Sequence, residues 1–94
     1  MNKHEAKDLA QKMREFAKNH LAKGLKTWKG EPDMVSMIRS DAKDFRKVAK
    51  LLRESKVKEA FMVAQCMDTS PRERIPDEIW NAMYTYCYPD DGGY

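Results

Sequence analysis

Cysteine is scarce in this sequence, with two residues in 94, Cys66 and Cys87. They lie far apart without C-x-x-C spacing, so a disulfide scaffold, a zinc ribbon and a thioredoxin-like redox site are all excluded. We expect both thiols to be free and mostly buried, where apolar neighbours keep a thiol protonated. A thiol in that state is not an activated nucleophile.

Glycine and proline are also sparse, at four residues each, while 41% of residues are hydrophobic and 35% are charged. This composition is typical of a globular chain and excludes a low-complexity or disordered one. Ninety-four residues are enough for one core, so we predict a single helical domain over residues 1–94, with residues 89–94 as a flexible tail.

Sequence motifs of catalytic and phosphate-binding sites are absent as well. The sequence has neither a GxGxxG nor a GxxxxGK[ST] phosphate loop, and no Ser, His and Asp arrangement matches a hydrolase elbow. His4 and His20 have no metal-ligand spacing relative to the cysteines, and His20 falls on an apolar helix face, where a hydrogen-bonded core histidine is expected. The sequence therefore predicts a protein that is not an enzyme, with no catalytic residue, no metal and no cofactor.

Long apolar runs are absent. The longest uncharged stretch, residues 79–89, is far shorter than the roughly 20 residues that a membrane span needs, and the charged amino terminus has no apolar signal segment. We therefore expect no membrane association and a cytoplasmic location.

Charge is plentiful but unevenly distributed. Residues 1–30 carry eight Lys or Arg against three Asp or Glu, residues 31–60 carry eight against six, and residues 61–94 carry two against six. The amino-terminal third is therefore basic and the carboxy-terminal third acidic. Such an asymmetry favours electrostatic partners or head-to-tail self-association.

Hydrophobic periodicity predicts helices along most of the chain. The first is expected from about Lys3 to Leu25, with Gly24 either as its stop or as a close-packing point. One arc of about 120° on this helix collects its apolar side chains and His20; its members are Ala6, Leu9, Ala10, Met13, Phe16, Ala17 and His20.

The segment 32–54 also has helical spacing, and Pro32 suits a first helical position. Asp41 and Asp44 resemble a capping pair, so we favour a short helix followed by a longer one over a single helix. Ser55 is a plausible cap for the next helix, which should end near Asp68.

A single turn with a capping box is predicted over residues 69–76, and Pro76 then begins the last helix, which Pro89 stops. The sequence therefore indicates an all-α protein, a compact bundle of four to five helices.

Every tyrosine lies between Tyr84 and Tyr94. Tyr84, Tyr86 and Tyr88 alternate as on a strand, but no other segment offers a strand partner, so we favour a helix. On a helix Trp80, Tyr84 and Tyr88 share one face at the edge of the core, while Tyr86 points elsewhere. These rings either cover the edge of the core with their hydroxyl groups in water or dock a protein partner. We predict docking, because aromatic residues with one polar end are enriched in protein interfaces.

The first helix offers an alternative site. Lys3, Lys7, Arg14 and Lys18 fall within about 60° of one another and form a basic stripe, which is either a solvated helix face or a contact for nucleic acid. No helix-turn-helix signal, RNP pattern or zinc ligand set accompanies the stripe.

In size and texture the chain is similar to small accessory proteins of tailed phages and bacterial mobile elements, which are often short, helical and without motifs, and which bind host or viral proteins. The sequence-based hypothesis is a small binding protein of accessory or inhibitor type. It docks a protein partner, a second copy of itself being one candidate, through Trp80, Tyr84, Tyr86 and Tyr88. Nucleic-acid binding by the basic first helix is the alternative.

Overall fold

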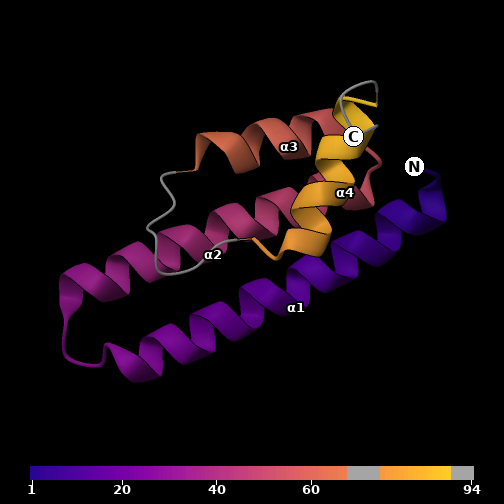
Figure 1. The fold of residues 1–94 in the computed structure, drawn as a ribbon. Helices are drawn as coiled ribbons and strands as arrows, with labels where there is room; N and C mark the ends of the chain where they lie inside the picture. The colour runs from indigo at the N-terminus through magenta and orange to yellow at the C-terminus, as the bar shows by residue number, and fades with distance from the viewer. Residues whose placement is uncertain (68–74, 90–94) are drawn as a thin grey trace.

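The computed structural model describes residues 1–67 and 75–89, and in these residues it contains four helices and no strand (Figure 1). The helices are α1 (Lys3–Thr27), α2 (Pro32–Arg53), α3 (Val57–Cys66) and α4 (Asp77–Cys87). The prediction of an all-α protein is confirmed. The predicted turn at 69–76 and the predicted tail at 89–94 lie largely outside the described residues. None of the described helices combines the length and the apolar character needed to cross a lipid bilayer.

The two long helices α1 and α2 pack side by side and antiparallel (Figure 1). The rings of Phe16 and Phe45 lie 4.9 Å apart, and His20 Nε2 lies 3.7 Å from an Asp41 carboxylate oxygen. The predicted apolar arc of α1 faces α2, and all of its members are buried except the half-buried Phe16. The prediction for α1 is therefore confirmed, and the helix begins at the predicted residue.

The predicted division of residues 32–54 into two helices is wrong, because α2 runs without a break from Pro32 to Arg53. Asp41, read as part of a cap, lies in the middle of the helix and directs its carboxylate toward His20 of α1. Neither glycine nor proline follows Pro32 within the helix, so nothing in its backbone forces an interruption.

The predicted capping role of Ser55 is also wrong. Ser55 has a φ of 62° and forms part of the end of α2, where its N–H donates to Leu52 O at 3.0 Å and Lys56 N–H donates to Leu51 O at 2.8 Å. This pair of bonds is a Schellman motif, which requires a left-handed residue at the position that Ser55 holds. The N-cap of α3 is Lys56.

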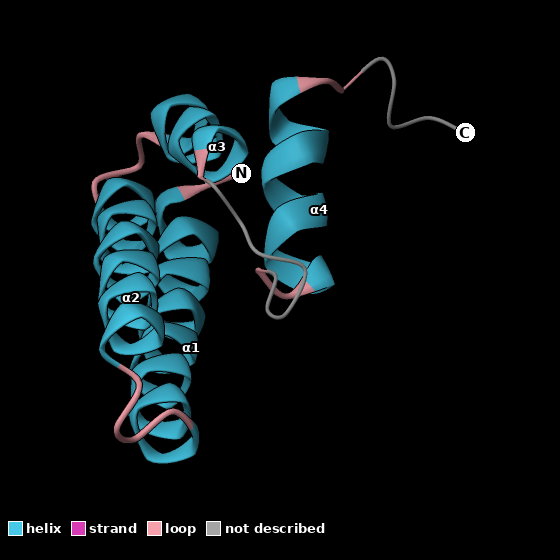
Figure 2. Ribbon diagram, turned by 90° about the vertical axis from the view of Figure 1, so that its left-hand side faces the viewer, coloured by secondary structure: helices cyan, strands magenta, loops and turns pink. Residues whose placement is uncertain are grey.

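The shorter helices form a second layer on one side of the α1–α2 pair. α3 packs on α2, and α4 packs against α3 and α1 (Figure 2). Since α3 is much shorter than α2, the far end of the α1–α2 pair extends beyond it, and the molecule measures 46 × 24 × 17 Å. The core lies between the layers and contains, besides smaller residues, Leu9, Met13, Phe45, Val48, Leu52, Phe61, Ile79 and Met83.

Gly24 is a close-packing point inside α1 and not the end of the helix. A Cβ atom built on Gly24 would lie 2.7 Å from both Cδ1 and Cγ2 of Ile38, which is buried on α2. Cγ2 branches directly from Cβ, so it cannot move aside without a change in χ1 or in the spacing of the helices. The absence of a side chain at Gly24 therefore lets α1 and α2 approach each other near their connecting turn.

Gly24→Ala should lower the free energy of unfolding by about 1 kcal/mol. Alanine gains roughly 1 kcal/mol of helix propensity, but overpacking costs about 1–3 kcal/mol. In an Ile38→Ala background the obstacle is gone, and the same substitution should become stabilising. Urea denaturation of the four proteins in this double-mutant cycle measures both effects. A stabilising Gly24→Ala in the wild-type background would contradict the packing described.

Candidate functional site

Two buried side chains hold α4 in place. Ile79 and Met83 are 1% and 0% exposed and belong to the core between α1 and α3. Pro76, at the N-cap, has the fixed φ that directs the chain into the helix. The remaining residues of α4 therefore lie along its sides or face outward.

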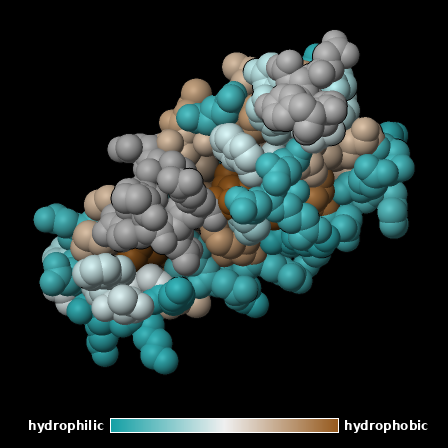
Figure 3. Space-filling model, viewed as in Figure 1, coloured by the Kyte–Doolittle hydropathy of each residue, from teal (hydrophilic) through white to brown (hydrophobic). Residues whose placement is uncertain are grey.

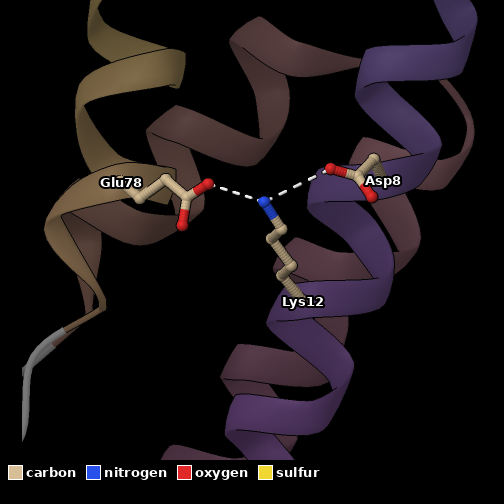
Figure 4. Close-up of polar contacts among 3 residues, drawn as sticks. All are labelled: Asp8, Lys12 and Glu78. Atoms are coloured by element: carbon tan, nitrogen blue, oxygen red, sulfur yellow. Dashed lines mark hydrogen bonds and ion pairs between the residues drawn. The ribbon is translucent and has the colours of Figure 1, made fainter.

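An ion-pair bridge joins the beginning of α4 to α1 (Figure 4). Lys12 Nζ lies 2.6 Å from Glu78 Oε1 and 3.3 Å from Asp8 Oδ2. Hydrogen bonds to Glu78 and then to Asp8 raise the pKa of Lys12 above its ordinary value. The side chains are well exposed, so the bridge contributes little to the stability of the fold.

Two aromatic side chains of α4 and the side chain of Tyr88, its C-cap residue, surround Phe61 of α3. The ring centroids of Trp80, Tyr84 and Tyr88 lie 4.9, 6.1 and 6.2 Å from that of Phe61, and Tyr84 and Tyr88 lie 5.1 Å from each other. The predicted aromatic row is thus present on one face. Trp80 and Tyr84 are half-buried and pack against the core, so they form part of the wall of the fold, whereas Tyr88 is 43% exposed.

Tyr86 lies on the other side of α4, as its spacing predicts, and is 39% exposed. It borders an open depression of about 520 Å³ between the beginning of α1 and the last turn of α4. We call this the terminal depression; it is lined by Met1, Glu5, Asn81, Ala82, Thr85, Tyr86 and Pro89. Hydrophobic side chains remain visible around α4 in Figure 3, while the edge formed by α1 is hydrophilic. Periodicity within α4 could not find this depression, because the two ends of the chain supply its walls.

The predicted basic stripe lies elsewhere. Lys3, Lys7, Arg14 and Lys18 are all exposed. Lys12, the residue that meets α4, lies roughly 150° around α1 from the centre of the stripe. The stripe and the aromatic row therefore belong to separate surfaces.

Sequence reasoning missed a second basic row on α2. Its spacing of four, three, four and three residues gives one face of a helix, and that signal is readable from the sequence. All five members are exposed: Arg39, Lys43, Arg46, Lys50 and Arg53.

The residues considered for catalysis are dispersed. His20 is buried between the rings of Phe16 and Phe45, at 6.2 and 5.2 Å, in the position expected of a core histidine. Across the described ranges, no group of three or more His, Cys, Asp or Glu side chains could hold a metal ion.

The prediction of buried thiols is wrong for Cys66, which is exposed. The apolar side of α3 runs through Ala60, Phe61 and Ala64, and Cys66 lies off it. Cys87 is half-buried, and burial raises its pKa, while the nearby positive charge of Lys58 opposes that shift.

Comparison with known proteins found no matching family model, no matching curated protein and no matching solved structure.

Proposed function

We propose that this protein is a non-enzymatic binding protein that docks a protein partner at the carboxy-terminal half of α4. The observation that carries the proposal is the exposure of Tyr86 in the last turn of α4 and of Tyr88 at its C-cap, on a helix anchored by buried Ile79 and Met83. Exposed tyrosines on a rigid element present large amphipathic area at a small entropic cost. Tyr86 borders the terminal depression on one side of α4, and Tyr88 borders the Phe61 cluster on the other, so a partner that encloses the end of α4 covers both.

The charge of α4 indicates which partner fits. Asp77 and Glu78 lie in its first turn, and residues 75–89 contain no Lys or Arg. A complementary partner has an apolar or aromatic site with a basic rim, since matched charges steer association and disfavour wrong partners. A second copy of this chain is one such protein, because its α1 and α2 are basic.

Tyr88→Ala and Tyr86→Ala should each weaken association by about 2 kcal/mol, roughly 30-fold in Kd, as truncated hot-spot aromatics do. Trp80→Ala should weaken it by more than about 2 kcal/mol, but Trp80 also packs on Phe61, so its effect includes a change in the fold. The two exposed tyrosines are therefore the cleaner probes. Titration calorimetry measures the affinity for a partner purified after parallel capture with wild type and variants, and light scattering measures self-association.

Met62→Ala is the matched control, because Met62 is 62% exposed on α3 and lies outside both aromatic features. It should leave the affinity unchanged. Wild-type affinity in both tyrosine variants, with their circular dichroism intact, would remove α4 from the interface and end the docking proposal.

A further inference from the structure

The antiparallel register of α1 and α2 brings their two basic rows opposite each other. Gly24 packs on Ile38, His20 meets Asp41, and Phe16 meets Phe45, so paired residue numbers add up to about 61. The same register places Lys18 across from Lys43, Arg14 across from Arg46, and Lys7 across from Arg53.

Both rows lie on the side of the α1–α2 pair that faces away from α3 and α4. On α2, the side chains of Asp44 and Lys47 border a depression shared with Met62 and Cys66 of α3. On α1, Lys12 meets Glu78 of α4. The second layer therefore occupies one side of the pair (Figure 2). On each helix the core arc separates the basic row from the residues that contact α3 or α4, so both basic rows lie on the other side of the pair.

We call this surface the basic face; it comprises Lys3, Lys7, Arg14, Lys18, Arg39, Lys43, Arg46, Lys50 and Arg53. Within residues 1–67 and 75–89, none of the nine takes part in an ion pair or side-chain hydrogen bond.

Several carboxylates of the two helices have other partners or neighbours. Glu5 accepts a hydrogen bond from the Asn2 amide, and Glu15 accepts one from the Gln11 amide. Asp8 pairs with Lys12, Asp41 faces His20, and Asp44 borders the depression beside α3. Nine cations that have no ion-pair partner among the described residues repel one another, which opposes folding. A surface with this repulsion is suited to an anionic ligand, because the negative charge of the ligand neutralises the cations.

We propose that the basic face binds the phosphate backbone of a nucleic-acid duplex without sequence preference. From Arg39 to Arg53 the row spans about 21 Å, and a duplex presents one phosphate charge per roughly 1.7 Å of its axis, so both rows find phosphates within reach. Neither row includes an aromatic side chain, whereas single-strand binders stack bases on aromatic rings. This site is separate from the α4 docking surface and goes beyond the function proposed there.

The test compares two triple variants that change net charge equally. Lys18, Lys43 and Lys50 to Gln removes three charges from the basic face, and Lys26, Lys56 and Lys58 to Gln removes three exposed charges outside it. Binding to a fluorescent 20-base-pair duplex of arbitrary sequence is followed by anisotropy between about 50 and 200 mM salt. The basic-face variant should lose about 10- to 100-fold in affinity, and the slope of log K against log salt should fall by about 2.7, because each lost phosphate contact removes roughly 0.9. The outside variant should bind like wild type.

Four outcomes would overturn the proposal. Equal losses of affinity in both triple variants would mean that binding depends on the net charge of the protein and not on the basic face. Tighter binding to a single strand of the same length would exclude duplex recognition. No binding to any nucleic acid at 50 mM salt would refute the proposal directly, and binding only to a poly-glutamate peptide would assign the face to an acidic protein. Because the tyrosines of α4 do not contribute to this face, Tyr88→Ala should bind the duplex normally, so the two proposals fail independently.

Discussion

Phe61→Ala should lower the free energy of unfolding by about 3–5 kcal/mol and loosen the attachment of α4. Phe61 is 2% exposed, and its ring is the common neighbour of Trp80, Tyr84 and Tyr88. Truncation removes one large ring and the support of three others. The remaining anchors of α4 are Ile79, Met83 and the exposed bridge through Lys12, and an exposed ion pair contributes little.

Fluorescence can separate loss of α4 from unfolding of the whole protein. Trp28 lies at the end of α1 and Trp80 on α4, so a Trp28→Phe background leaves Trp80 as the reporter for α4, while circular dichroism follows all four helices. In the Phe61→Ala protein the fluorescence transition should precede the circular-dichroism transition in urea, a departure from two-state behaviour.

Met62→Ala is again the control, since it truncates the next residue of the same helix but a side chain that is mostly in solvent. It should change stability by less than about 0.5 kcal/mol and leave the two transitions coincident. Coincident transitions in Phe61→Ala, with a loss under about 1.5 kcal/mol, would show that the aromatic cluster does not hold α4.

The helices and their buried faces were predictable because each one shows its own period. In α3 and at its C-cap every predicted apolar residue is buried: Val57, Ala60, Phe61, Ala64 and Met67. The apolar residues of α4 divide as its period implies: Ile79 and Met83 are buried, while Trp80 and Cys87 lie half-buried beside them. A pattern of this kind depends only on local geometry and needs no knowledge of neighbours.

Features that depend on two segments at once could not be predicted. Asp41 resembles a helix cap within its own segment, and only the position of His20 on α1 explains a carboxylate in the middle of α2. The basic face is a similar case, because each row looks like a solvated helix side until the register places Arg14 across from Arg46. The pattern within one segment predicts which face of its helix is apolar or basic, but only the pairing of the helices determines which of these faces lie next to each other.

Phe45 lies at the centre of the α1–α2 pair. Phe45→Ala should cost about 3–5 kcal/mol, because Phe45 is 1% exposed and its ring lies 4.9 Å from that of Phe16 and 5.2 Å from that of His20. Total stabilities of small domains are about 5–15 kcal/mol, so this single change removes a large part of the total. Thermal and urea denaturation measure the loss.

Phe16→Ala is the matched control, with the same side chain in the same cluster on the facing helix. Phe16 is only half-buried, so its truncation leaves a site open to water and should cost clearly less than truncation of Phe45. Equal costs would mean that the two rings are equally enclosed, which would contradict the packing of α1 on α2.

The same variant links the core to the basic face. Phe45 lies between the Lys18–Lys43 and Arg14–Arg46 pairs of the register, so the hairpin that it stabilises is also the support that keeps the two basic rows together. A ligand that binds only the folded hairpin stabilises it by about 2.7 kcal/mol at 100 times its Kd. Duplex at that concentration should therefore raise the midpoint of thermal unfolding of Phe45→Ala and restore over half of the lost stability. When Lys18, Lys43 and Lys50 are also changed to Gln, the 10- to 100-fold weaker binding should restore only about 0.4–1.4 kcal/mol. An equal shift in both proteins would show that the duplex acts elsewhere than on the face that Phe45 supports.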